Sequence, residues 1–235
     1  MGKRSRERVS GHAASWVAPD RMSVSSHKLS QTRRQPPCRM TGPGLHQITM
    51  RGEIEVAPGL LIAMPQLADP NFQRSVVLMI EHQTHGSFGL IVNRPSESRV
   101  LDLLEPLDIV WRGRTSDVAW WGGPVQPETG WILHEPVPDI AGDSTREIAP
   151  GVHLSSAPDA LRFLSKQPPT RIRLVLGYSG WGPEQLEGEL SEGAWVNSDV
   201  TADLVFETDP ERLWEVAVRR LGVEPQALVP ASGVH

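Results

Sequence analysis

Short apolar runs closed by glycine, proline or turn residues follow one another along most of this sequence, and their length constrains the fold more than any other feature. The run 59–64 (GLLIAM) ends at Pro65, and 75–82 (SVVLMIEH) is rich enough in valine and isoleucine to be a buried strand. After a Thr-His-Gly turn comes the run 87–93 (SFGLIVN). We therefore expect 75–82 and 87–93 to form a β-hairpin.

Further strands are expected in the second half of the chain. The segments 118–123 (VAWWGG) and 129–135 (TGWILHE) predict a second strand pair around the connection PVQPE. The run 171–179 (RIRLVLGYS) alternates and then becomes continuously apolar, which is typical of a central strand. Shorter strands are expected at 151–156, 193–197 and 202–207.

Helices are fewer and begin at known signals. The segment 100–107 predicts a short helix, and 158–167 predicts another, with Ser155 or Ser156 as its N-cap and a proline in its first turn. A third helix is expected at 183–190, where a proline again stands at the first position.

The last helix has the clearest signals. Thr208 and Glu211 form a capping box, Pro210 suits the first turn, and Gly222 follows the last apolar position. One apolar stripe at helical spacing consists of Leu213, Trp214, Ala217, Val218 and Leu221. Because strands outnumber helices and many connections are short, the sequence predicts the α+β class with a mixed, mostly antiparallel sheet.

Charge divides the chain into a tail and one domain. Residues 1–51 hold ten Lys and Arg against two acidic residues, a net charge of +8, while the rest holds 13 basic and 26 acidic residues, a net charge of −13. The tail is poor in large apolar residues, so we expect 1–51 to be a disordered basic extension, 52–230 the domain and 231–235 a flexible C-terminus. Three interpretations of this tail remain open: a transit peptide, a nucleic-acid-binding arm, or upstream sequence that is not part of the natural protein. We favour upstream sequence, because several internal methionines offer alternative starts.

Composition excludes several classes of site and partner. Cys38 is the only cysteine, which excludes an internal disulfide or a thiolate metal site and suits a reducing cytoplasm. No apolar run approaches the ~18 residues of a membrane span and no segment resembles a secretion signal, so we expect a cytoplasmic protein without membrane contact. A domain with a net charge of −13 repels phosphate groups, so direct nucleic-acid binding by the core is not expected.

Four blocks of sequence stand out together. They are GLLIAMPQLADPNFQRSVVLMIEH (59–82), GSFGLIVNRP (86–95), WGGPVQPETGWILHE (121–135) and GYSGWGPEQLEGEL (177–190). In this order and spacing the chain resembles, over about 52–230, the YqgE/AlgH family of bacterial proteins, also called UPF0301 or DUF179. The resemblance implies an α+β domain in which a mixed sheet is partly rolled into a small barrel and flanked by helices. It implies no established activity, although a regulatory role in exopolysaccharide production has been proposed for some members and some carry the label of transcriptional regulator.

The pentapeptide GYSGW within the last block comes within one residue of the nucleophile elbow G-x-S-x-G. That turn needs a glycine two residues after the serine, and Trp181 stands there instead. A hydrolase would use His134 or His153 as the base, with Asp199 to orient it, and Ser179 or a nearby carboxylate as the second group. The interpretation that we prefer is a glycine corner between a strand and the next helix.

A metal site is not expected, although several ligand types cluster in the sequence. Glu81, His82 and His85 lie close together, and His134 and Glu135 form a second pair. Strand alternation sends neighbours to opposite faces, and a turn is a natural place for solvated polar residues. We therefore expect neither a metal nor another cofactor.

Polar groups beside the strand-end turns predict a recognition surface. The Asn93-Arg94 pair offers an amide and a guanidinium to a carboxylate, a phosphate or a partner backbone. Trp121 and Trp181 are expected to be the exposed tryptophans of a contact patch, because each lies beside glycines. The binding candidates are Asn93, Arg94, Gly122, Gly123, Pro124, His134, Ser179 and Trp181. The leading hypothesis is a non-enzymatic accessory or regulatory protein that acts through a protein partner or a small ligand, and the alternative is a hydrolase.

Overall fold

The computed structural model describes residues 56–138, 140 and 145–228. The expectations of a disordered extension at 1–51 and a flexible terminus at 231–235, like Cys38, lie outside these residues. Within the described part, every helix is too short or too polar to cross a membrane.

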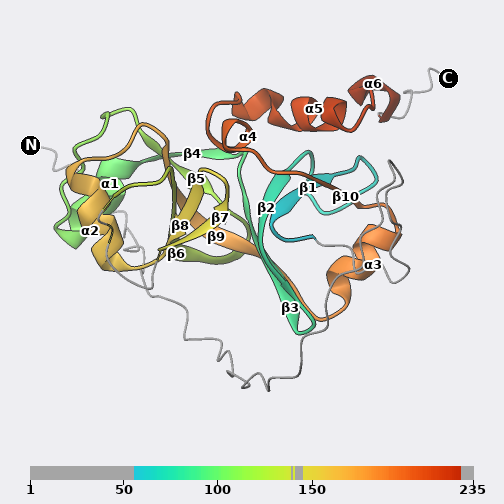
Figure 1. Ribbon diagram of the computed structural model, residues 1–235, viewed down its shortest axis with the longest axis horizontal. Helices are drawn as coiled ribbons and strands as arrows, with labels where there is room; N and C mark the ends of the chain where they lie inside the picture. The colour runs from blue at the N-terminus through green and yellow to red at the C-terminus, as the bar shows by residue number, and fades with distance from the viewer. Residues whose placement is uncertain (1–55, 139, 141–144, 229–235) are drawn as a thin grey trace, which may run out of the picture. The chain divides into compact units, whose positions relative to one another are not determined.

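The described residues form a ten-stranded sheet that curls into a half-barrel, with helices around it (Figure 1). The strands are β1 (Gly59–Ala63), β2 (Val76–Gln83), β3 (Gly86–Ile91), β4 (Pro95–Arg99), β5 (Val118–Trp121), β6 (Val125–His134), β7 (Thr145–Ala149), β8 (Val152–Ser155), β9 (Ile172–Trp181) and β10 (Trp195–Ser198). Their order is β10-β1-β2-β3-β9-β6-β8-β7, and β5 pairs with both β4 and β9. All pairs are antiparallel except β5 with β9. The α+β class with a mixed, mostly antiparallel sheet is thus confirmed, as is the β2–β3 hairpin.

Strand β9 joins the two halves of the sheet. Along one edge it pairs first with β5 and then with β3, and along the other edge it pairs with β6. The expectation that 118–123 and 129–135 pair with each other is therefore wrong. Both segments pair with β9, which lies between them, and Val175 is the register partner of Trp120 on one side and of Trp131 on the other.

The segment between β5 and β6 carries the chain from one edge of β9 to the other. It crosses at Gly177, and the two backbones approach so closely that a Cβ on Gly123 would lie 2.3 Å from the carbonyl group of Tyr178. A Cβ on Gly122 would likewise lie 2.5 Å from the Gly177 oxygen, and Gly177 has a φ of +71°. Only glycines permit this crossing, which a short hairpin loop would not need.

The helices are α1 (Val100–Leu104), α2 (Pro158–Lys166), α3 (Gln185–Ser191), α4 (Ala202–Phe206), α5 (Pro210–Arg220) and α6 (Pro225–Leu228), and the 3-10 turn η1 (Glu105–Leu107) extends α1. Figure 1 shows α4 and α5 beside the β1–β2 half of the sheet, α3 near the β3 end, and α1 and α2 around the other half. In this arrangement α5 is anchored to the sheet by the Trp214 indole, whose Nε1 donates to the Ala63 carbonyl at 2.7 Å.

Several helix boundaries differ from the expectations. The expected strand 202–207 is instead the helix α4 (Ala202–Phe206), which begins where the Thr201 hydroxyl accepts a hydrogen bond from the Leu204 N–H. Neither Ser155 nor Ser156 caps α2, whose N-cap is Ala157.

The two later helices also begin one or two residues after the expected position. Helix α3 begins at Gln185, after Glu184 turns the chain with a φ of +61°. The N-cap of α5 is Asp209, whose Oδ1 accepts from the Glu211 N–H at 2.9 Å. The expected cap Thr208 instead donates its hydroxyl proton to the Asp203 carbonyl.

Candidate functional site

The serine of the GYSGW pentapeptide lies inside β9, and the expected strand-to-helix corner comes only after Trp181. Ser179 is fully buried, and its hydroxyl donates to the Gly122 carbonyl at 3.1 Å. The same carbonyl accepts from the Ile91 N–H at 2.9 Å. The structure thus brings Ser179, Gly122 and Gly123 together at the backbone crossing, where they hold β3, β9 and the incoming chain in register. Pro124, the next residue, is exposed.

Asn93 and Arg94 fasten the loop that precedes β2. The Asn93 amide accepts from the Val76 N–H at 2.9 Å and donates to the Arg74 carbonyl at 3.0 Å. Arg94 donates to the Gln73 carbonyl at 2.9 Å, and its guanidinium lies 5.3 Å from the centre of the Trp121 ring. Burial lowers the pKa of Arg94. Most polar groups of this turn are therefore already bonded to their own chain.

His134 lies apart from these residues, in a buried polar chain that sequence reasoning missed. His134 is opposite Ile172 in the β6–β9 register, so seven residues of β9, roughly 20 Å, separate it from Ser179. Its Nδ1–H donates to the Glu135 carbonyl at 2.7 Å, which leaves Nε2 to accept from the Ser155 hydroxyl at 2.9 Å. Ser155 is in turn 2.6 Å from the Thr145 hydroxyl.

His134 and Ser155 are hydrogen-bonded as a catalytic base and nucleophile would be, but their position in the core leaves no access for a substrate. Both residues are fully buried, and burial lowers the pKa of His134. A neutral imidazole that accepts from a serine in the core stabilises the β6–β8 pair. His134 therefore makes contact with neither Ser179 nor the strand-end turns.

Trp181 is 5% exposed, so its expected place in an exposed contact patch is wrong. Its ring stacks near Phe72, with a centroid distance of 6.1 Å, and meets Trp195 edge-on at 5.8 Å. The Nε1 atoms of both tryptophans donate to one oxygen of Glu189, at 3.0 and 2.7 Å. The bulky residue of the pentapeptide thus anchors α3 to β9.

The ligand types that cluster in the sequence have other partners in the structure. Glu81 forms an ion pair with Arg146 at 2.8 Å, and His82 Nδ1 lies 2.7 Å from the Ser87 hydroxyl. Within the described residues, no three His, Cys, Asp or Glu side chains are placed to hold a metal ion.

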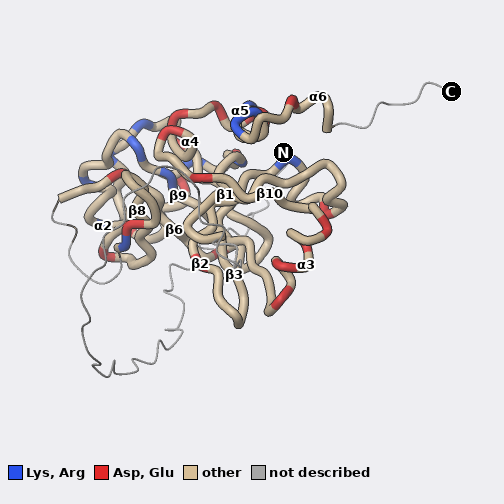
Figure 2. The backbone as a smooth tube through the Cα atoms, turned by 45° about the vertical axis from the view of Figure 1, so that its right-hand side comes forward, with Lys and Arg blue, Asp and Glu red and all other residues tan. Residues whose placement is uncertain are grey.

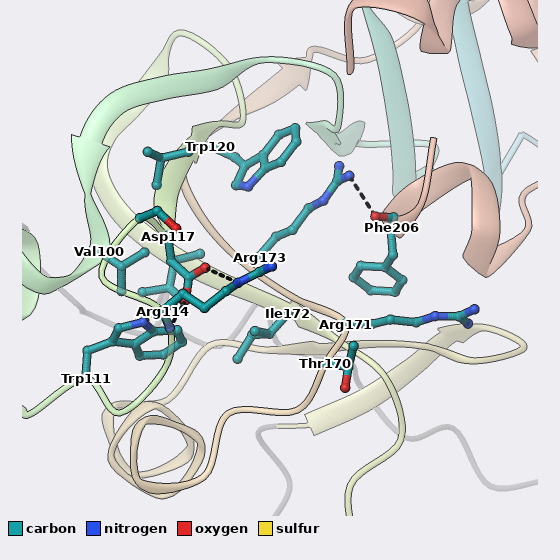
Figure 3. Close-up of a pocket in the computed structure, with 13 residues that line it drawn as sticks. Val100, Trp111, Arg114, Asp117, Trp120, Thr170, Arg171, Ile172, Arg173 and Phe206 are labelled. Atoms are coloured by element: carbon teal, nitrogen blue, oxygen red, sulfur yellow. Dashed lines mark hydrogen bonds and ion pairs between the residues drawn. The ribbon is translucent and has the colours of Figure 1, made fainter. Parts of the chain in front are cut away.

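A pocket of about 340 Å³ opens where β5 and β9 diverge (Figure 3). The two strands pair only at Trp120–Val175 and Trp121–Leu176, and the pocket lies on the N-terminal side of these pairs. We call it the arginine pocket, because three of its lining residues are Arg114, Arg171 and Arg173. Sequence reasoning did not single out this site.

Arg173 is the central group of the arginine pocket. The residue is 6% exposed, and its guanidinium lies 3.6 Å from the centre of the Trp120 ring. It donates to the Val92 carbonyl at 2.6 Å and, at 3.4 Å, to the Phe206 carbonyl. No carboxylate within the described chain pairs with it. Burial lowers the pKa of Arg173 to about 9, which leaves it charged at neutral pH.

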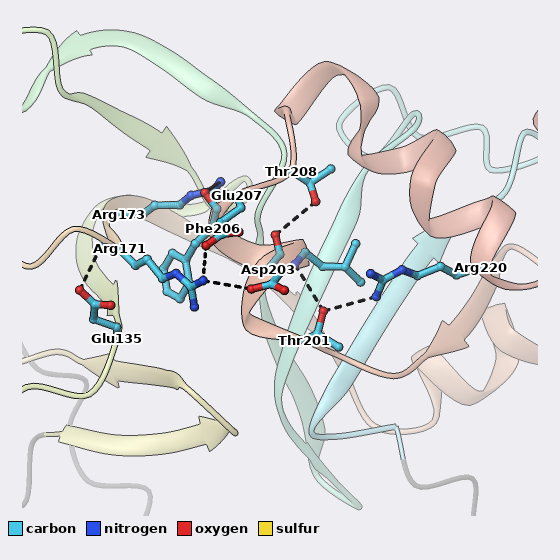
Figure 4. Close-up of polar contacts among 10 residues, drawn as sticks. Glu135, Arg171, Arg173, Thr201, Asp203, Phe206, Glu207, Thr208 and Arg220 are labelled. Carbon is cyan, nitrogen blue, oxygen red and sulfur yellow. Dashed lines mark hydrogen bonds and ion pairs between the residues drawn. The ribbon is translucent and has the colours of Figure 1, made fainter.

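The other two arginines of the pocket have acidic partners. Arg114 lies 3.3 Å from Asp117, whose carboxylate also accepts from the Trp111 indole at 2.9 Å. Arg171 points out of the pocket toward α4, where it pairs with Glu207 and, at 3.1 Å, with Asp203 (Figure 4). The hydrogen bond that Arg171 donates to the Glu207 carboxylate raises the pKa of Arg171. Arg173 is thus the one lining cation that no described carboxylate neutralises.

The guanidinium of Arg173 gives the arginine pocket the means to bind an anion. An arginine holds its proton and offers five N–H donors, of which Arg173 uses two in the described structure. The described lining contains neither a histidine nor a cysteine. The sequence signal was present in RIRLV (171–175), where an arginine interrupts the apolar run of a strand expected to be central.

Comparison with known proteins gives one consistent result. The model of the AlgH-like family DUF179 matches residues 60–226. A UPF0301 protein of Myxococcus xanthus is 42% identical over 181 residues, covering 77% of this chain and 98% of the relative. One from Anaeromyxobacter sp. is 43% identical over 185 residues, covering 76% and 94%. The solution structure of the AlgH protein from Pseudomonas aeruginosa superposes with a TM-score of 0.61 at 35% identity, covering 75% of this chain and 94% of that one.

Proposed function

We propose that this chain, which belongs to the AlgH-like family of UPF0301 proteins, is a non-enzymatic accessory protein of the cytoplasm that binds a small anion in the arginine pocket. The observation that carries the proposal is the buried charge of Arg173 in a pocket of about 340 Å³. Taking an isolated charge out of water costs several kcal/mol, and a bound anion recovers part of that cost. Pockets of this size accommodate small molecules.

The pocket supports this proposal better than the strand-end turns do. Asn93 and Arg94 bond to their own loop, and Gly122 and Gly123 are occupied by the backbone crossing. A protein partner at those turns would meet chiefly Pro124 and the edge of Trp121. The geometry therefore supports binding of a small ligand better than it supports binding of a protein partner at these turns.

Two other functions have less support in the structure. A hydrolase would need Ser179 and His134 in contact and accessible, and they are buried at distant points of β9 and β6. Nucleic-acid binding would need a continuous basic face, whereas Figure 2 shows acidic positions along α3 and alternating charges along α5.

The test is an NMR titration of the full chain with acetate, benzoate and inorganic phosphate. We expect at least one anion to shift the indole N–H signals of Trp111 and Trp120 in a saturable way. Arg173→Met should weaken that binding by roughly tenfold to a hundredfold, since a hydrogen bond to a charged group contributes about 1.5–3 kcal/mol. Arg162→Met removes an exposed arginine of α2 and should leave the binding unchanged.

Two outcomes contradict the proposal. One is that no anion produces a saturable shift in the unmodified chain, and the other is that Arg173→Met binds as tightly as the unmodified chain. Because Arg173 also holds Val92 and Phe206, Arg173→Lys serves as a second variant that keeps the charge. It should fold and should bind more weakly than arginine, since a lysine lacks the planar set of donors.

A further inference from the structure

On the basis of the anion-binding function proposed above, we infer that the ligand of the arginine pocket is a small carboxylic acid with a single negative charge and a flat apolar body. Three features of the pocket lead to this class: the number of unmatched charges, the acidic groups at its edge, and the composition of its walls. Each excludes a different alternative among small anions.

Only one positive charge at the pocket lacks a counter-charge among the described residues. Arg114 is neutralised by Asp117, and Arg171 by Asp203 and Glu207, so Arg173 alone remains without a counter-charge in the described chain. A carboxylate supplies one negative charge, and its two oxygens match the parallel donors of a guanidinium.

Acidic groups at the edge of the pocket disfavour a ligand that carries a second negative charge. Arg171 faces two carboxylates at once, and its own N–H lies 3.3 Å from the Glu135 carboxylate (Figure 4). The surroundings of Arg171 therefore carry more negative than positive charge. A dianion such as a phosphate monoester at Arg173 would be repelled by this group and by Asp117, while a monoanion gains the full attraction of Arg173.

Part of the wall next to the charge is aromatic and aliphatic, and the rest is polar, from Arg114, Ser116, Asp117 and Thr170. Figure 3 shows the rings of Trp111 and Phe206 on either side of Ile172, all half-buried. Val100 and Leu174, which also line the pocket, are 2% and 1% exposed, so the apolar part of the lining is continuous with the core. A ligand with a flat ring would cover these partly exposed side chains, whereas a bare inorganic anion or acetate would leave them in water.

The experiment compares four probes that separate charge from ring, at pH 7.5 and low salt, by the indole signals of the full chain. They are phenylacetate, acetate, benzyl alcohol and phenyl phosphate. We expect phenylacetate to bind roughly tenfold more tightly than acetate, because ring burial removes apolar surface from water. We also expect it to bind roughly tenfold more tightly than phenyl phosphate, which is mostly a dianion at this pH, and benzyl alcohol to give no saturable shift.

A pair of variants tests the aromatic wall separately. Phe206→Ala removes the ring but keeps the main-chain carbonyl that accepts from Arg173, so phenylacetate affinity should fall toward that of acetate while acetate affinity stays. Phe163→Ala, an exposed ring on α2, is the matched control and should change neither affinity.

Each contrary result refutes a different part of the inference about the ligand. Acetate binding as tightly as phenylacetate refutes the flat apolar body, and phenyl phosphate binding more tightly than phenylacetate refutes the single charge. Both results leave the anion-binding function standing. If none of the probes binds, the proposed function fails as well.

Discussion

The carboxylate of Glu189 should be one of the most important polar groups for stability, because one of its oxygens serves two buried indoles. Trp181 and Trp195 are 5% and 2% exposed, and both Nε1 atoms donate to Oε2. Glu189→Ala leaves both donors without this acceptor, at about 1–3 kcal/mol each, so we expect the free energy of unfolding to fall by about 2–6 kcal/mol. That is a large share of the ~5–15 kcal/mol that stabilises a typical domain. Glu189→Gln keeps one acceptor oxygen and should cost less.

Urea unfolding followed by circular dichroism measures this loss directly. The matched control is Glu187→Ala, which removes a carboxylate from the same helix where it makes only a 3.7 Å contact with His82. A surface change of that kind stays within about 0.5 kcal/mol. If Glu189→Ala were no more destabilising than Glu187→Ala, the two indole hydrogen bonds would contribute nothing to stability and the account of Trp181 as the anchor of α3 would be refuted.

Two further predictions concern the crossing and the buried histidine. Gly123→Ala places a Cβ 2.3 Å from the Tyr178 carbonyl at a φ of +147°, so it should cost more than about 3 kcal/mol in urea unfolding. The control Gly188→Ala, in open space within α3, should be neutral or stabilising by up to ~1 kcal/mol, and equal effects of the two changes would argue against the crossing. Because burial lowers the pKa of His134, the unfolded chain takes up that proton first as pH falls below ~6.5, and folding stability then decreases by about 1.4 kcal/mol per pH unit down to the folded pKa. Unfolding measured from pH 7.5 to 5 should show a flatter profile for His134→Gln than for the unmodified chain, while His85→Gln, at an exposed turn, should keep the original slope.

Local signals in the sequence were sufficient for most strands and for the last helix. The hairpin of β2 and β3 follows from two β-branched runs around a glycine turn, and α5 follows from its apolar stripe. These features depend on neighbours within a few residues, which a sequence displays directly. The class of fold followed from the lengths of the runs and was strengthened by the four family blocks.

Features that depend on contacts between distant segments could not be predicted in the same way. Strand β9 separates 118–123 from 129–135 because the chain crosses it, and no local pattern distinguishes such a crossing from a hairpin. Helix α4 was expected as a strand because its apolar residues suit either structure, and the Thr201 cap decides the outcome.

The arginine pocket could not be predicted from the sequence either, because it too depends on contacts between distant segments. Its lining comes from α1, the segment before β5, β5 itself, the start of β9 and the end of α4, which are spread over more than 100 residues of the sequence. The one local clue, Arg173 in an apolar run, has the ordinary interpretation of an alternating strand. Only the structure shows that this guanidinium is buried against Trp120 and without a carboxylate partner among the described residues.

The glycines of the family blocks and the arginine pocket are linked through the path of the chain. Because the chain leaves the edge of β9 at Gly122 and crosses at Gly177, the pairing of β5 with β9 ends there, after Trp120–Val175 and Trp121–Leu176. On the other side of these two pairs the strands separate, and the gap is the arginine pocket with Arg173 in its wall. The pentapeptide that resembles a nucleophile elbow thus has a positional role: its first glycine fixes the crossing, its serine holds Gly122, and its tryptophan anchors α3.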